Sequence, residues 1–125
     1  MKIELDTNKG PHNHIQSYAA NRIVVTDRHY NTSIIVSPDQ LDDSWPPRHV
    51  RELRDTHLES VLEFNPEIML LGTGNTLIFP ADDVLRPWIE ATAGFEIMDT
   101  GAACRSYNIL RAEGRHVVAA LIMLE

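Results

Sequence analysis

The pattern of hydrophobic and polar positions predicts two strands that are buried on both faces. Residues 68–71 and residues 117–124 are uninterrupted apolar runs, and the second run contains eight residues. A strand that is apolar on both faces belongs in a sheet that is covered on both sides. Because so apolar a run does not remain solvated, we expect residues 117–124 to form a buried central strand.

Short apolar runs in the first half of the chain predict further strands. The β-branched residues 23–26 and the stretch 30–36 are separated by turn-compatible residues, which is typical of a hairpin. The Ser-Pro-Asp sequence at residues 37–39 ends the second strand, because proline cannot extend a hydrogen-bonded ladder. Further strand candidates are residues 14–18, 76–79 and 95–98.

Two helices are predicted from start and stop signals. The sequence Thr56-His57-Leu58-Glu59 has the capping-box pattern, in which a hydroxyl and a carboxylate satisfy free N–H groups at a helix start. Apolar residues follow at helical spacing, and Pro66 ends this helix. The second helix spans roughly residues 82–93, where Pro87 implies either a start near Arg86 or a distorted first turn.

A third helix is predicted over about residues 101–113. Asp99 and Thr100 are both competent N-caps, and Gly114 suits the left-handed position after a helix. The alternation of strands and helices after an antiparallel-leaning first half predicts a three-layer α/β fold. This fold has a mixed central sheet of about five strands, helices on at least one face and a small β layer. A length of 125 residues fits one domain, residues 1–125.

The segment between residues 45 and 53 leaves alternatives open. Trp45-Pro46-Pro47 is interpreted as a rigid surface turn, although an exposed tryptophan there could instead contact a partner. Residues 49–53 fit either a short strand or the early turn of a longer helix.

Charge and composition narrow the function classes. The chain has 18 acidic and 11 basic residues, and this net charge of −7 disfavours binding to nucleic acid. The single cysteine excludes an internal disulfide framework. No apolar run approaches the ~18 residues of a membrane span, and no signal-peptide pattern is present. We therefore expect a cytoplasmic protein without a membrane span.

The main candidate for a binding site is the sequence that follows the buried run 68–71. Ligands gather at the carboxyl ends of strands in open α/β sheets, and glycine N–H groups can approach an anion. The alternative is a plain tight turn, because glycine is the usual residue where φ is positive. With the start of the third helix, this gives a candidate ligand pocket of Gly72, Thr73, Gly74, Asn75, Thr100, Cys104 and Arg105.

Cys104 is the one candidate nucleophile in this pocket. A helix N-terminus and the neighbouring Arg105 favour a thiolate, which could act with a histidine as base. Against this, Cys104 follows two alanines in a small-residue packing face, and free cysteine is usually a buried hydrophobe. We assign no catalytic residue on this basis.

Other charged and metal-ligating residues give weaker signals. His12 and His14 form a close pair without a helical partner, and no zinc-binding spacing is present, so we expect no metal site. The sequence Glu113-Gly114-Arg115 fits a solvated helix end. Arg105, Arg111 and Arg115 could line an anion patch, although their spacing does not place all three on one helical face.

Several of these motifs together resemble a known family. They are Leu71-Gly72-Thr73-Gly74, Met98-Asp99-Thr100, Ala102-Ala103-Cys104-Arg105, Tyr107-Asn108-x-Leu110 and Glu113-Gly114-Arg115. The chain resembles the Mth-type family of uncharacterised domains, which includes the mitochondrial complex I assembly factor 3 and an adipogenesis-associated protein of animals. The resemblance implies a three-layer α/β fold with a mixed sheet whose last strand runs antiparallel to the others.

The resemblance also bears on function. The family has no established catalytic residues, and its animal mitochondrial members support respiratory complex assembly through protein contacts. This chain lacks an Arg-rich presequence and is more similar to the compact bacterial members. We therefore expect a non-enzymatic interaction or assembly-helper module with a protein partner and no cofactor. The alternative is a small-molecule or anion site, or a thiol-dependent enzyme, at the candidate pocket.

Overall fold

The computed structural model describes residues 12–125, which form eight strands, three α-helices and one short 3₁₀ helix. The strands are β1 (Ile15–Ala19), β2 (Arg22–Val25), β3 (Arg28–Tyr30), β4 (Ile34–Val36), β5 (Leu41–Asp42), β6 (Ile68–Gly72), β7 (Gly94–Met98) and β8 (Val117–Leu121). The helices are the 3₁₀ helix Val50–Glu52, α1 (Asp55–Leu62), α2 (Asp82–Ile89) and α3 (Thr100–Ala112).

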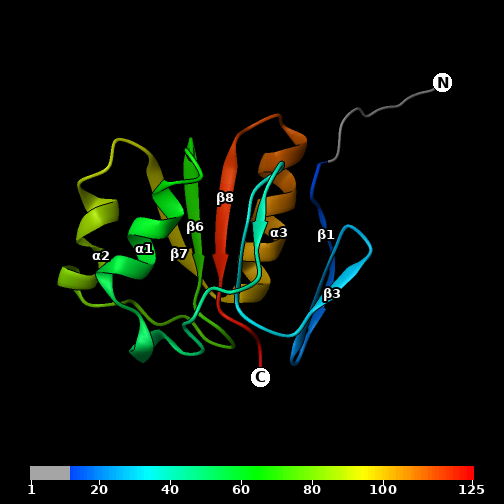
Figure 1. Cartoon of the computed structure of the whole chain (residues 1–125), viewed down its shortest axis with the longest axis horizontal. Coiled ribbons are helices and arrows are strands. Elements are labelled where there is room, and N and C mark those ends of the chain that lie inside the picture. The colour runs from blue at the N-terminus through cyan, green and yellow to red at the C-terminus, as the bar shows by residue number, and fades with distance from the viewer. Residues whose placement is uncertain (1–11) are drawn as a thin grey trace.

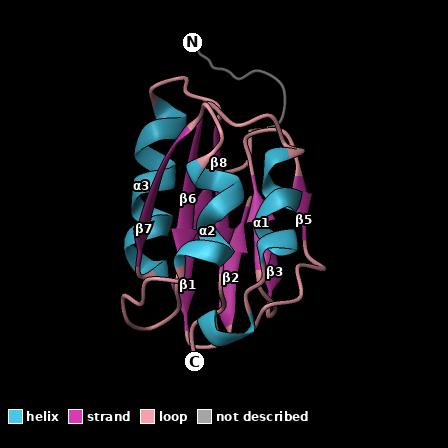
Figure 2. Cartoon of the chain, turned by 90° about the vertical axis from the view of Figure 1, so that its left-hand side faces the viewer, coloured by secondary structure: helices cyan, strands magenta, loops and turns pink. Residues whose placement is uncertain are grey.

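These elements form three layers around a five-stranded sheet of order β5-β4-β8-β6-β7. Helices α1 and α2 cover one face of this sheet, as Figure 2 shows. Helix α3 and the three-stranded sheet β1-β2-β3 cover the other face (Figure 1). Two apolar cores result, one on each side of the central sheet. The three-layer α/β fold with a mixed central sheet is therefore confirmed.

The directions of the strands correct one detail that the resemblance implied. Strand β8 is parallel to β6, and β6 is parallel to β7, whereas β4 is antiparallel to both β8 and β5. The last strand is thus antiparallel only to β4. The reason is that α2 and α3 connect successive strands as crossovers, and such connections produce parallel neighbours.

The central position of β8 follows from its composition. All five of its residues are buried, and it lies between β4 and β6. The strand ends at Leu121, before the end of the predicted run. Beyond it, the Ile122 N–H donates to the Gly72 carbonyl, and the Met123 N–H donates to Ser33 Oγ. The predicted buried central strand is confirmed, with a shorter range.

The second strand of the predicted hairpin is divided between two sheets. Strands β2 and β3 pair as a hairpin, but residues 34–36 leave it and form β4 in the central sheet. Ile34, Ile35 and Val36 are all buried. Because the three-stranded sheet leaves one face to solvent, only the central sheet can cover both sides of such a strand.

The region between β5 and α1 differs from two predictions. Trp45 is only 3% exposed, and its Nε1 donates to the His57 carbonyl at 3.2 Å, so it is a core residue and not an exposed contact. Helix α1 begins at Asp55, ahead of the predicted Thr56 cap. The Arg54 N–H donates to His57 Nδ1 at 3.0 Å. Burial, followed by the charge of Arg54, lowers the pKa of His57 and keeps that nitrogen free to accept.

The structure also corrects two predictions for the segment that follows β6. Residues 76–79 form an irregular loop and not a strand. Helix α2 ends at Ile89, with Pro87 inside it, so the helix neither starts at Arg86 nor reaches residue 93. Helix α3 agrees closely with its prediction, because Asp99 Oδ1 accepts from the Ala102 N–H and Gly114 has a φ of 83°.

Candidate functional site

The carboxyl end of β6 lies directly against the start of α3. A Cβ at Gly72 would lie 2.8 Å from Thr100 Oγ1 and 2.9 Å from Thr100 Cα. Real Cβ atoms do not approach a backbone atom so closely, so any larger residue would push the helix away from the strand. The first glycine of the Gly-Thr-Gly sequence is therefore required by packing.

The Thr100 side chain joins three segments at this point. Its hydroxyl is buried, donates to the Ile122 carbonyl at 2.6 Å and accepts from the Gly74 N–H at 2.8 Å. The Thr100 N–H donates to the Gly74 carbonyl, and the Thr73 N–H donates to the Met98 carbonyl, both at 2.9 Å. The N–H groups of Thr73 and Gly74 are thus already bonded within the protein, which leaves neither of them for an anion.

The loop that follows is shaped by two polar side chains. Thr73 Oγ1 donates to the Thr76 carbonyl at 2.6 Å and accepts from the Ile78 N–H at 3.2 Å. The Asn75 amide makes two bonds to the backbone of Glu125, at 2.8 and 2.9 Å. These contacts hold residues 73–79 against the last residues of the chain.

A cleft of about 510 Å³ opens beside this loop, at the carboxyl edge of β6 and β8. Such an edge is where ligands bind in open α/β sheets. Three segments far apart in the sequence build the cleft. Its lining residues include Arg48, His49, Val50, Arg51 and Leu53, then Thr73, Gly74, Asn75, Thr76, Ile78, Phe79, Pro80, Ala81 and Val84, and finally Ile122, Met123 and Glu125.

Large apolar side chains are exposed at the mouth of the cleft. Leu77 is 52% exposed, Ile78 49% and Phe79 67%, and the last two line the cleft itself. Ile89 on α2 and Ile109 on α3 are also exposed, but neither lines this cleft. We refer to residues 77–79 as the apolar loop, because it is where consecutive large apolar side chains face solvent.

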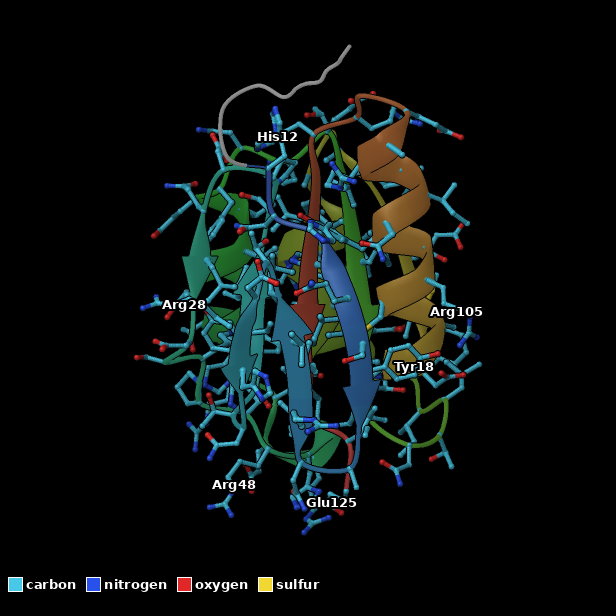
Figure 3. All side chains as sticks on the ribbon, turned by 90° about the vertical axis from the view of Figure 1, so that its right-hand side faces the viewer. His12, Tyr18, Arg28, Arg48, Arg105 and Glu125 are labelled. Atoms are coloured by element: carbon cyan, nitrogen blue, oxygen red, sulfur yellow. The ribbon has the colours of Figure 1, made fainter. Side chains whose placement is uncertain are left out.

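Basic side chains gather on another wall of the cleft, where two arginines supply the positive charge. Arg48, His49 and Arg51 all line it, and His49 Nε2 lies 3.2 Å from Glu125 Oε2. Neither arginine side chain has an ion-pair or hydrogen-bond partner within residues 12–125. Arg48 and Glu125 lie at the same end of the molecule in Figure 3. The cleft thus combines an apolar wall with a cationic one.

The structure brings together some of the candidate pocket residues and separates others. Thr73, Gly74 and Asn75 line the cleft, whereas Gly72 and Thr100 are buried behind it. Residues 48–51, the apolar loop and Glu125 were not among the candidates. The sequence signal for the apolar loop is its hydrophobic run, which predicts a strand and not an exposed loop.

Cys104 and Arg105 lie away from the cleft. Cys104 is 1% exposed in the core that α3 forms with the three-stranded sheet. Burial raises the pKa of the Cys104 thiol to about 12, although the charge of Arg105 opposes this shift. A thiol that stays protonated is a poor nucleophile. Arg105 is exposed and donates to the Tyr18 hydroxyl on β1, and the two side chains adjoin in Figure 3.

The remaining charged candidates lie at the opposite end of the molecule. Arg111 and Arg115 line a hollow of about 360 Å³ together with His12 and His116, without Arg105. Figure 3 shows His12 at the end remote from Arg48. Residues 12–125 contain no cluster of three His, Cys, Asp or Glu side chains suited to a metal ion. In that same range, every helix is too short or too polar to cross a membrane.

The fold and the cleft define a three-layer α/β domain with an open hollow at one edge of its central sheet. The chain belongs to the family described as protein of unknown function (DUF498/DUF598), whose model matches residues 15–122.

Solved structures of bacterial proteins are similar to the chain over most of its length. A Bordetella parapertussis protein is 32% identical with a TM-score of 0.85, and the match covers 93% of this chain and 99% of that one. A Bordetella pertussis protein described as a Mth938-like domain is 29% identical with a TM-score of 0.80, covering 97% and 91%. The resemblance to the Mth-type family is thereby confirmed.

A further relative carries a name that refers to membranes. The "13 kDa major membrane protein" of Francisella tularensis subsp. holarctica is 28% identical over 114 residues, which are 86% of this chain and 88% of the relative.

Proposed function

We propose that this chain is a non-enzymatic protein-interaction module whose binding surface is the cleft together with the apolar loop. The observation that carries the proposal is the exposure of Leu77, Ile78 and Phe79, three consecutive large apolar side chains. Grouped exposed apolar residues with a polar rim are typical of protein–protein contact sites. Aromatic and arginine side chains, here Phe79 with Arg48 and Arg51, dominate the binding energy of such sites.

The chemistry of the cleft favours binding over catalysis. Thr73 Oγ1 is occupied by two backbone groups of its own loop, and His49 is paired with the Glu125 carboxylate. Neither side chain is paired as a nucleophile with its base, which is the arrangement that covalent catalysis needs. These polar groups instead shape the surface that a partner would meet.

An assembly-helper role in the cytoplasm fits this surface. A domain that docks on a larger partner needs an exposed apolar patch but no cofactor of its own. Docking on a membrane-bound partner would also account for membrane association without a spanning helix, in line with the name of the Francisella relative. We therefore propose a protein partner and neither nucleic acid nor a metal as the target of this chain.

The proposal can be tested by selecting partners with random peptides displayed on phage. Peptides selected on the immobilised full chain are expected to bind about tenfold or more weakly to a Phe79→Ser variant, the scale of a hot-spot residue. Ile109→Ser is the matched control, because Ile109 is 60% exposed but lies on α3, away from the cleft. Fluorescence polarisation of the synthesised peptides measures their affinity for the wild type and for each of the two variants. If no peptide is enriched, or if Ile109→Ser weakens binding as much as Phe79→Ser does, the proposed surface is wrong.

The cleft volume supports a second candidate, a small amphipathic anion. A volume of about 510 Å³ falls within the ~300–1,000 Å³ of small-molecule sites. A thermal-shift series with alkyl carboxylates and the matching alcohols distinguishes this candidate from the first. Stabilisation by the carboxylates alone, without peptide enrichment on phage, would favour the small ligand.

A further inference from the structure

We propose that the cationic wall of the cleft is a subsite for a carboxylate side chain, and that the chain's own Glu125 takes up the His49 contact of this subsite in the structure. The partner segment would then present an acidic residue beside apolar ones, and Glu125 would compete with it. This inference rests on the proposed function and specifies the chemistry of the partner.

The first observation that supports this proposal is the distribution of charged side chains in the cleft. Arg48, His49 and Arg51 line it, and Glu125 is the acidic residue among the lining side chains. This grouping stands out in a chain whose net charge is −7. Guanidinium groups recognise carboxylates well, because their fixed N–H donors match the geometry of the two oxygens. Within residues 12–125, neither Arg48 nor Arg51 has a side-chain partner that would occupy these donors.

The second observation that supports this proposal is the position of Glu125. Its carboxylate lies 3.2 Å from His49 Nε2, and its backbone is held by both polar atoms of the Asn75 amide. Asn75 is also two residues from the apolar loop. A carboxylate at this place therefore lines the same cleft as Ile78 and Phe79, and we assign this combination of an acidic and an apolar group to the partner.

The contact between Glu125 and His49 is weak, so an acidic residue of the partner can displace the Glu125 side chain. The Glu125 side chain is 63% exposed and that of His49 is 32% exposed, so the pair lies largely in water. Such surface pairs stabilise by only about 0–1 kcal/mol. Arg48, Met123 and Glu125 also line a second hollow of about 390 Å³, which offers the displaced side chain another place.

The test uses peptide pools that differ in one functional group. Acetylated, amidated pentapeptides with random Leu, Ile, Phe or Met positions and a final Glu are compared with the same pool ending in Gln. Binding to the ¹⁵N-labelled full chain is followed at the amides of Asn75, Ile78 and Phe79. In a Glu125→Gln variant we expect the Glu pool to bind about fivefold more tightly than to the wild type, the scale of one surface ion pair. The Gln pool should bind equally to both.

A matched variant controls for net charge. Glu113→Gln removes the same charge from an exposed residue at the far end of α3, and it should bind both pools as the wild type does. The inference is overturned if the Glu pool binds no better than the Gln pool, or if Glu125→Gln gives no gain. If both pools shift the Phe79 amide signal with equal affinity, the carboxylate subsite is wrong, but the proposed interaction surface is still supported. Tighter binding of a phosphoserine pool would replace carboxylate by phosphate as the ligand, and no binding by any pool would count against both proposals.

Discussion

Two neighbouring regions at the carboxyl edge of β6 and β8 use their side chains in opposite ways. In the junction, which we define as Gly72, Gly74, Thr100 and Ile122, every polar contact described above is satisfied inside the protein. In the apolar loop, residues 77–79, about half or more of each side chain faces water. Only a few residues separate the two regions along the chain.

The contrast indicates which residues fix the architecture and which are free to bind. The Gly-Thr-Gly sequence and Thr100 belong to the motifs that carry the family resemblance, and their atoms are used to join β6, α3 and the end of β8. The apolar loop makes no comparable contribution to the core, and its exposure has a cost that a partner could offset. A recognisable motif can therefore mark the scaffold of a site and not its contact surface.

The strongest test of the junction is Gly72→Ala, which should destabilise the protein by about 3 kcal/mol. The added Cβ would lie within 3 Å of Thr100 Oγ1 and Cα, and the helix backbone cannot yield as a flexible side chain does. Urea unfolding measures the change in the free energy of unfolding. Gly94→Ala is the control, because nothing lies within 4 Å of its Cβ position and its φ is not positive. Similar losses for both variants would show that the junction is not tightly packed.

Removal of the Thr100 hydroxyl should have the next largest effect, about 2 kcal/mol in a Thr100→Val variant. The change leaves the Gly74 N–H and the Ile122 carbonyl without this buried partner, and an unsatisfied buried group costs about 1–3 kcal/mol. The same substitution at the exposed Thr92 should be nearly neutral in urea unfolding. If Thr100→Val were as stable as the wild type, the three-way hydrogen-bonded junction would not matter for stability.

The same contrast explains how much the sequence could predict. The buried strands β6 and β8 and the ends of α3 have strong local signals, namely two continuous apolar runs, the Asp99 cap and Gly114. The divided hairpin was missed because local β propensity does not say which of two sheets a strand will join. The antiparallel pairing of β4 with β8, a strand far along the chain, places β4 in the central sheet.

The cleft could be predicted only in part, for a related reason. The sequence places residues 73–75 at this edge because they follow a buried strand, but Arg48, Arg51 and Glu125 reach the cleft from distant parts of the chain. The sequence suggests Cys104 as a site residue because a cysteine near a helix N-terminus can be reactive. Which face of α3 it occupies depends on the packing of the three-stranded sheet, and that packing buries it.

The smallest expected effect comes from truncating an exposed leucine of the apolar loop, which can be compared directly with a buried leucine of β6. Leu77→Ala should change the free energy of unfolding by about 0.5 kcal/mol or less, because the side chain is 52% exposed. Leu71→Ala removes the same atoms from a fully buried position on β6, and it should cost about 3 kcal/mol. Parallel urea titrations of the two variants measure the difference between their free energies of unfolding. A loss at Leu77 close to that at Leu71 would mean that the apolar loop belongs to the core, and the interaction surface would then lose its physical basis.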